Sequence, residues 1–389
     1  MASRRLLLVQ STVPPYPGGT NTVIERLLRD LPGWEADAVT DRAMRRHQRG
    51  AAAPFAARAH VLKLPPWRAI APLAHALNAA LAVVAGARAA LFARRRGAGA
   101  ILTTFDGGFS QIAATVAARL TGLPLVVFVF DLWEENAYSG VERATARLLE
   151  SRILCKAAAV VVFCEAAAEH YRVKHGISAD VLQIPLARDS TPDPDPPRPL
   201  GAAEEVEVFV AGALYWAQED AVRRLAAAVH AAPELRLTVV GDRGELERRG
   251  LHADRVEERL AGGAFQERLE RADTIALGLS LHSPHPDIVR TATPARLVDY
   301  MASGRPLLVH APGDSHVARY ARAEDFAEVV DADDVDEVTA GLRRLVADPA
   351  RAAERGVRAR ALAAERHDCR VVQQGLAAIL ARVTGAAGS

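Results

Sequence analysis

The sequence predicts an α/β protein with two domains, each built on a parallel sheet. Apolar, strand-like runs alternate with helical segments through both halves of the chain, the order typical of parallel sheets covered by helices. With 389 residues, the chain is long enough for two separate cores. A proline-rich stretch that is poor in apolar residues, 187–205, is typical of a linker between domains.

Eleven apolar runs are predicted to be strands. In the first half they lie at 6–10, 36–40, 100–103, 125–130, 160–163 and 181–184. In the second half they lie at 206–211, 235–240, 274–279, 307–309 and 327–330. The first run is too short for a secretion signal, although two arginines precede it, and it is predicted to be the first strand.

Composition narrows the class of protein. Half of the residues are hydrophobic and 24% are charged, as in an ordinary soluble globular protein. The formal net charge of +1 argues against a nucleic-acid-binding protein, for which a basic excess is expected. The three cysteines are odd in number and are not spaced as zinc ligands, so we expect no metal site and a reduced, cytoplasmic location.

The segment 291–309 is the most informative part of the chain. Thr293 is predicted to cap a helix, Pro294 fits its first position, and Gly304 fits the position just past its end. The free N–H groups of a helix N-terminus favour an anion, and Arg296 adds positive charge there. Asp299 can accept hydrogen bonds from vicinal hydroxyls. The segment therefore predicts a binding site for a phosphorylated ligand.

A glycine-containing loop follows the first predicted strand. Gly18 and Gly19 precede an amphipathic helix that Thr20 or Asn21 is predicted to begin. Glycine lets a ligand approach the backbone closely, and the helix start favours an anion. The alternative is a glycine turn that serves only chain geometry. The loop is not G-x-G-x-x-G, so an NAD-dependent oxidoreductase is disfavoured.

Acidic residues end two predicted strands of the first half. Asp131 follows a fully apolar run, and Trp133 and Glu134 come directly after it. In open α/β sheets, ligands bind outside the carboxyl ends of the strands, so Asp131 sits where chemistry is expected. The alternative, that Asp131 caps the next helix, stays open. Asp106, followed by two glycines, is a weaker candidate for such chemistry.

Three strings in this sequence resemble motifs of glycosyltransferase family 4. PARLVDYMASGRP at 294–306 is similar to P-S-K-L-x-E-Y-M-A-x-G-x-P, with Arg296 at the Lys position and Asp299 at the ribose-binding Glu position. PPYPGG at 14–19 is similar to P-P-x-x-G-G, and FVFDLWEE at 128–135 is similar to R-D-L-W-P-E. The resemblance implies the GT-B fold, which has two Rossmann-like domains with parallel sheets that face an inter-domain cleft.

The resemblance also implies a domain organisation. It places an acceptor-side domain at 1–186 and a nucleotide-sugar-binding domain at 206–368, joined by the linker 187–205. A C-terminal helix within 369–389 would cross back to the first domain.

Site residues follow from the same resemblance. Asp131 is the candidate catalytic residue, and Asp106, Trp133 and Glu134 are candidates on the acceptor side. The candidate donor-binding residues are Gly18, Gly19, Gly212, Gly241, Arg243, Arg290, Thr291, Thr293, Arg296 and Asp299.

The sequence departs from the family pattern at two places. Thr291 stands where many members have a Glu against the donor sugar, and the usual Arg and Lys after Gly212 are absent. Arg296, Arg290 and Arg243 are therefore the candidates for neutralising the donor diphosphate.

The function implied is retaining transfer of a sugar from a nucleotide-diphosphate sugar to a glycan, lipid-linked or small-molecule acceptor, without a metal or cofactor. The alternatives are a non-catalytic GT-B protein that binds a nucleotide sugar, and a GT-B sugar-nucleotide epimerase. The apolar segment 67–96, which ends in three arginines, is predicted to be a core helix; alternatively it contacts an anionic membrane surface from the cytoplasmic side.

Overall fold

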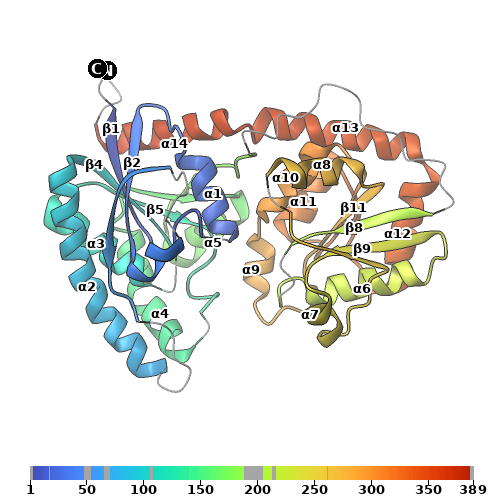
Figure 1. Cartoon of the computed structure of the whole chain (residues 1–389), viewed down its shortest axis with the longest axis horizontal. Coiled ribbons are helices and arrows are strands. Elements are labelled where there is room, and N and C mark those ends of the chain that lie inside the picture. The colour runs from blue at the N-terminus through green and yellow to red at the C-terminus, as the bar shows by residue number, and fades with distance from the viewer. Residues whose placement is uncertain are drawn as a thin grey trace. The chain divides into compact units, whose positions relative to one another are not determined.

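The computed structural model describes residues 3–16, 18–47, 54–64, 71–105, 108–137, 139–187, 205–212, 216–260 and 262–385. The chain divides into two compact units, both visible in Figure 1. Unit 1 comprises Met1–Pro185 together with Cys369–Ser389, and unit 2 comprises Leu186–Asp368. Each unit is built on one parallel sheet, so the predicted fold class is confirmed.

The sheet of unit 1 has the strand order β3-β2-β1-β4-β5-β6-β7 within the described residues, and every pair is parallel. Its strands are β1 Arg4–Val9, β2 Trp34–Asp41, β3 Phe55–Val61, β4 Ala98–Thr104, β5 Leu125–Val129, β6 Ala159–Val162 and β7 Asp180–Val181. The helices are α1 Gly19–Leu28, η1 Arg42–His47, α2 Ala71–Arg96, α3 Phe109–Thr121, α4 Gly140–Leu154, α5 Glu165–His175 and α14 Cys369–Val383.

The sheet of unit 2 has the order β10-β9-β8-β11-β12-β13 within the described residues, again all parallel. Its strands are β8 Val206–Val210, β9 Leu235–Val240, β10 Arg255–Glu257, β11 Thr274–Gly278, β12 Leu307–His310 and β13 Glu328–Val330. The helices are α6 Glu219–His230, α7 Arg243–Arg248, α8 Gly263–Arg271, α9 Pro286–Thr291, α10 Ala295–Ser303, α11 His316–Glu324, α12 Val335–Ala347 and α13 Pro349–Arg366.

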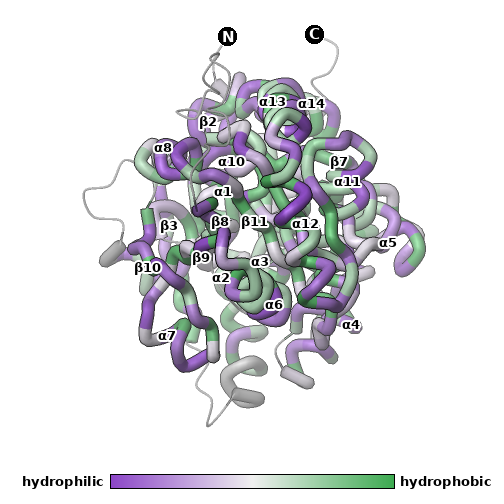
Figure 2. The backbone as a smooth tube through the Cα atoms, turned by 90° about the vertical axis from the view of Figure 1, so that its right-hand side faces the viewer, coloured by the Kyte–Doolittle hydropathy of each residue, from purple (hydrophilic) through white to green (hydrophobic). Residues whose placement is uncertain are grey.

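Burial explains why the central strands are almost purely apolar. Residues 6–8 of β1 and residues 126–127 of β5 are fully buried, and so are residues 208–209 of β8. A parallel strand in the middle of such a sheet is covered by helices on both faces, so neither face tolerates polar residues. Figure 2 shows such a hydrophobic segment at β11.

The last helix, α14, belongs to unit 1 although it follows the whole of unit 2. The Gln373 side chain is buried and its Nε2 donates to the backbone carbonyls of Arg26 at 2.9 Å and Arg29 at 2.7 Å. These carbonyls lie at the C-terminal end of α1, where helical carbonyls have no partner within the helix. The Cys369 thiol also donates to the carbonyl of Arg26. Side-chain hydrogen bonds thus attach the end of the chain to its beginning.

Each of the eleven predicted runs overlaps a strand, although the run 181–184 shares only Val181 with β7. Two strands were missed. β3 reads FAARAHV, and β10 has only the three residues of RVE. Both lie at the edge of their sheet, where one side of the strand has no neighbour and the apolar pattern weakens. Most of the predicted linker lies outside the described residues, which resume at Glu205.

Candidate functional site

The candidate site of unit 2 lies at the carboxyl ends of its central strands. β8 is the first strand of the unit; β9 pairs with one side of it and β11 with the other. The chain therefore reverses direction across the sheet between β8 and β11, and ligands of open α/β sheets bind at this switch point. Gly212 follows β8 there, and Gly241 follows β9.

Arg296 lies directly against the backbone of Gly212. A β-carbon at position 212 would be 1.7 Å from Nη1 of Arg296 and 2.7 Å from its Cζ, so only glycine leaves room for this guanidinium. Gly212 also has φ of +121°, which disfavours any residue with a side chain. The predicted donor residues Gly212 and Arg296 are therefore brought together, and positive charge is held at the end of β8.

Tyr300 joins α10 to the same strand end. Its hydroxyl donates to the carbonyl of Ala211 at 2.8 Å and accepts from the N–H of Ala211 at 3.1 Å. Desolvation raises the pKa of Tyr300, so the phenol stays neutral and both hydrogen bonds persist over a wide pH range. Asp299, the predicted ribose-binding residue, precedes Tyr300 on α10 and is buried.

The start of α10 differs from the prediction. Pro294 and not Thr293 is the N-cap residue, so the predicted capping role of Thr293 is wrong. Proline has no side-chain acceptor, and the first amides of α10 receive no hydrogen bond from a capping side chain. The Thr293 hydroxyl is buried and has no hydrogen-bond partner among the described residues. At the other end, Gly304 adopts the predicted left-handed conformation, with φ of 67°.

A small cavity of about 60 Å³ lies between the ends of β8 and β9. Gly212, Gly241 and Asp242 line it together with Arg249 and Arg259. Arg249 forms ion pairs with Glu219 and Glu245. The two arginines were not predicted, because nothing in their local sequence distinguishes them from other surface arginines.

The remaining predicted donor residues lie on α9 and α7. Thr291 is the last residue of α9, and its hydroxyl donates to the carbonyl of Asp287 at 2.9 Å. Arg290 forms an ion pair with the side chain of Asp287 at 2.6 Å. Arg243 is the first residue of α7 and is exposed. Of the three arginines predicted to neutralise a diphosphate, Arg296 is thus the one held against the strand end.

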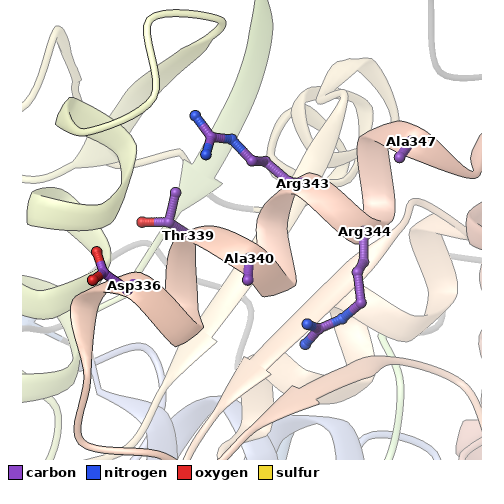
Figure 3. Close-up of a pocket in the computed structure, with 6 residues that line it drawn as sticks. All are labelled: Asp336, Thr339, Ala340, Arg343, Arg344 and Ala347. Atoms are coloured by element: carbon purple, nitrogen blue, oxygen red, sulfur yellow. The ribbon is translucent and has the colours of Figure 1, made fainter.

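A larger hollow in unit 2 lies away from the candidate site. It measures about 430 Å³ and lies on α12, where Figure 3 shows Arg343 and Arg344 extending to opposite sides of the helix. Arg343 pairs with Glu234, just before β9, and Arg344 pairs with Glu328, the first residue of β13. The hollow is therefore at the amino ends of the strands, away from the edge where ligands bind, and both arginines have counter-ions.

In unit 1, Asp131 lies two residues beyond the end of β5. The alternative that it caps the next helix is wrong, because the N-cap of α4 is Ser139, whose hydroxyl accepts from Glu142 N at 3.1 Å. The Asp131 side chain is exposed, although the surrounding protein raises the pKa of its carboxyl by desolvation. An exposed carboxyl group at this edge of the sheet can accept a hydrogen bond from a ligand.

The neighbours of Asp131 differ in accessibility. Trp133 is only 2% exposed and packs on Phe105 with the ring centroids 5.2 Å apart, so it supports the loop and is not presented to an acceptor. Glu134 is half-buried and pairs with Arg147 and Lys174. Asp106 lies outside the described residues.

The predicted glycine loop begins α1. Gly18 is its N-cap residue, with φ of 143°, and Gly19 is its first helical residue. A β-carbon at Gly19 would meet no atom within 4 Å, so this position is open. The helix begins one or two residues earlier than predicted.

A buried ionic network fixes the loop that follows Asp131. Lys174 of α5 donates to Glu135 of the loop and to Glu150 of α4, each at 2.7 Å. His170 and His175 of α5 contact the same two carboxylates at 3.2 and 2.8 Å. Burial alone would raise the pKa of Glu135, but the hydrogen bonds from His170 and Lys174 lower it to about 2. No local sequence pattern predicts this network, whose members lie up to 40 residues apart.

Comparison with protein families identifies the N-terminal part of the chain. Residues 18–187 match the family model described as a glycosyl transferase 4-like domain. The chain therefore contains a glycosyl transferase 4-like domain, which spans less than half of its length. The resemblance to family 4 is therefore confirmed, and the matched residues include Gly18, Gly19, β5 and the loop that follows Asp131. The motif at 294–306 lies outside the matched range.

Solved structures share the fold of this chain over nearly its whole length. A sucrose-phosphate synthase from Thermosynechococcus elongatus has a TM-score of 0.72 and 16% identity, covering 98% of this chain and 100% of that one. HepE from Anabaena, solved with UDP, has a TM-score of 0.68 and 16% identity, covering 97% and 100%. A glycosyltransferase from Rickettsia africae ESF-5 has a TM-score of 0.69 and 9% identity, covering 98% of each chain. These likenesses confirm the GT-B fold. No curated protein sequence matches the chain.

The network around Lys174 gives a prediction for the stability of the glycosyltransferase. Substitution of Lys174 by Met leaves Glu135 and Glu150 without their main counter-ion, and the local free energy of unfolding should fall by about 3 kcal/mol or more. Hydrogen exchange of the α5 amides, followed by mass spectrometry, measures this loss. The control is Arg172→Gln on the same helix, which removes the exposed pair with Glu169 and should leave the exchange rates nearly unchanged, because solvent screens an exposed pair. Equal effects of the two substitutions would contradict the role of Lys174.

A second prediction concerns acid stability. The pKa of Glu135 is lowered from an ordinary 4.5 to about 2, so its contribution to stability is present above pH 5 and is lost as the pH falls towards 2. The shift corresponds to about 3 kcal/mol. Urea denaturation of the wild type and of Glu135→Gln should show a difference in unfolding free energy that shrinks between pH 5 and pH 3. A difference that stays constant would show that the carboxylate is not held in its charged form.

Proposed function

We propose that this glycosyltransferase is a retaining enzyme that moves a sugar from a nucleoside-diphosphate sugar to an acceptor hydroxyl. The acceptor would be a glycan, a lipid-linked sugar or a small natural product. The observation that carries the proposal is the placement of Arg296 against Gly212 at the carboxyl end of β8, with Asp299 one turn further along the same helix.

The proposed roles follow from the chemistry of each group. The first amides of α10 have no capping side chain and can donate to a phosphate, and the guanidinium of Arg296 supplies the positive charge. Asp299 accepts hydrogen bonds from the ribose hydroxyls of the nucleotide. The Anabaena HepE structures that share this fold were solved with UDP, with UDP and glucose, and with UDP-glucose, so UDP-glucose is the first donor to test.

The transfer itself needs charge neutralisation more than covalent help from the protein. In the proposed reaction the acceptor oxygen bonds to the anomeric carbon on the face from which the diphosphate leaves. The acceptor proton passes to the departing phosphate oxygen, so no other proton carrier is required. Arg296 and the α10 amides stabilise the negative charge that develops on the diphosphate. Asp131 of unit 1 is proposed to accept a hydrogen bond from a second hydroxyl of the acceptor, next to the one that attacks, since its carboxyl group is exposed.

Thr291 limits the hydrogen bonds that the site can form with the donor sugar. A threonine has no charge, and its single hydroxyl proton is used on the carbonyl of Asp287. We therefore propose that most of the donor affinity comes from the nucleotide diphosphate and little from the sugar.

Removal of Asp299 tests the nucleotide site. Asp299→Ala should weaken UDP binding about 10- to 100-fold, because a hydrogen bond to a charged acceptor contributes roughly 1.5–3 kcal/mol. Isothermal titration calorimetry measures the affinity, and circular dichroism checks the fold. Asp299→Asn keeps the volume of the side chain and should lose affinity with less disturbance of α10.

The matched control for Asp299 is Glu354→Ala, which removes an exposed carboxylate of α13 that pairs with Arg351. Its affinity for UDP should equal that of the wild type. Unchanged affinity in both Asp299 variants would overturn the ribose assignment, even if UDP itself binds.

The reaction is tested with a panel of nucleoside-diphosphate sugars and acceptors, with the product stereochemistry read by NMR. Transfer with the anomeric configuration of the donor supports the proposal, and inversion of that configuration contradicts it. Epimerisation of the donor without any acceptor would show a sugar-nucleotide epimerase instead.

A further inference from the structure

Three helices of unit 1 form a surface that is apolar and basic but lacks exposed carboxylates. α2, α3 and α4 contact one another on one side of the sheet, as Figure 1 shows. α2 and α3 contain no Asp or Glu, and the two glutamates of α4, Glu142 and Glu150, are buried. This surface, named here the α2–α4 face, differs from the rest of a chain whose acidic and basic residues nearly balance.

The apolar part of the α2–α4 face is a stripe along α2. Leu77, Val84 and Leu91 are spaced seven residues apart, which puts them on one side of a helix, and Val83 lies beside them. These four side chains are 44%, 58%, 51% and 51% exposed in the same order. At 1.5 Å per residue, the stripe is about 21 Å long.

The opposite side of α2 is packed in the protein. Ala82, Ala85, Ala89 and Ala93 are buried in the core of unit 1. Among the described helices, α2 alone is long and apolar enough to cross a membrane, over Ala76–Arg96, and a third of its most apolar window is buried. With one side in the core and one side exposed, α2 is arranged to lie on a surface and not to cross a bilayer.

Arginines continue the same stripe. Arg88 and Arg95 are exposed and follow Val84 and Leu91 by four residues each, so they border the apolar stripe. Arg119 of α3 and Arg143 of α4 are also exposed and add positive charge to the neighbouring helices. None of these four arginines forms an ion pair within the described part of the chain. The guanidinium of Arg94 donates to the carbonyl of Leu120, which brings the ends of α2 and α3 together.

We propose that the α2–α4 face docks this glycosyltransferase on an anionic lipid bilayer, at the cytoplasmic side of a membrane. Leu77, Val83, Val84 and Leu91 would enter the boundary between headgroups and acyl chains, and the four arginines would meet lipid phosphates. A bilayer surface satisfies both parts of the face at once, because it offers apolar depth beside a layer of negative charge. An exposed stripe of this length is otherwise in contact with water, which is unfavourable for apolar side chains.

The orientation of the helices keeps docking compatible with catalysis. α2, α3 and α4 run antiparallel to the strands, so their C-terminal ends and most of the arginines lie at the amino ends of the strands. Asp131 lies at the carboxyl end of β5, at the other edge of the sheet. Docking through the α2–α4 face leaves that edge accessible to an acceptor.

The experiment measures binding of the full chain to vesicles by flotation, at low salt. Vesicles of phosphatidylcholine alone are compared with vesicles that contain 30% phosphatidylglycerol. We expect binding to the anionic vesicles that falls with added salt, and about 30-fold weaker binding of the double variant Arg88→Gln, Arg95→Gln, because each arginine near such a surface contributes about 1 kcal/mol. Val84→Gln with Leu91→Gln should weaken binding about tenfold.

The matched control is Val357→Gln with Arg358→Gln on α13, where an apolar and a basic residue are exposed outside the α2–α4 face. It should bind vesicles as the wild type does. Absence of binding to anionic vesicles overturns the proposal, and so does equal loss of binding in the control. A dimer in light scattering that the α2 substitutions dissolve would instead assign the face to a second copy of the chain. Glycosyl transfer to a soluble acceptor should be unchanged in all these variants, whose substitutions lie outside the candidate site.

Discussion

The two hydrogen bonds between the Tyr300 hydroxyl and the backbone of Ala211 fix the geometry on which the candidate donor site depends. They attach α10 to the end of β8, so that Arg296, one turn before Tyr300, reaches the backbone of Gly212. Gly212 accepts this contact because it has no side chain, and its positive φ turns the chain away from the strand. Asp299 is carried to the same edge by the same attachment. Loss of the Tyr300 phenol would therefore detach the Arg296 guanidinium, the Asp299 carboxylate and the N-terminus of α10 from the end of β8 together.

The two units fix their carboxyl edges by different physical means. Unit 2 uses a neutral phenol whose ionisation is suppressed by burial, and this arrangement is insensitive to pH. In unit 1 the loop after Asp131 is held by ion pairs of Lys174 with Glu135 and Glu150. These pairs stabilise the loop only as far as the attraction between the charges exceeds the free-energy cost of removing them from water. The two kinds of attachment should respond differently to acid: the loop of unit 1 loosens as Glu135 is protonated, while α10 remains attached to β8.

Sequence reasoning succeeded where a local pattern is directly tied to structure. Central strands such as β1 and β8 are buried on both faces, so their runs of apolar residues are unambiguous. Gly304 was predicted correctly because a helix ends readily in the left-handed conformation that glycine allows. The incorrect predictions have physical causes as well. β3 and β10 are edge strands, in which the pattern of apolar residues is weak, and the N-cap residue of α10 is Pro294 instead of Thr293. Nothing local to Lys174 indicates that it contacts a loop 39 residues earlier, because such contacts are decided by packing.

Unit 1 has two surfaces that differ in charge. The net charge of the whole chain is only +1, but the α2–α4 face is basic, because the exposed charged residues of these helices are arginines in the described part of the chain. Asp37 pairs with Arg5 and with Arg96 at the end of α2, and Glu150 is buried beside Lys174, so neither carboxylate pairs with Arg88, Arg95, Arg119 or Arg143. The exposed carboxylate of Asp131 is left at the opposite edge of the sheet. An anionic surface bound to the arginines would therefore not be repelled by the acceptor-side carboxylate, and the two functions can operate on one domain without competing for it.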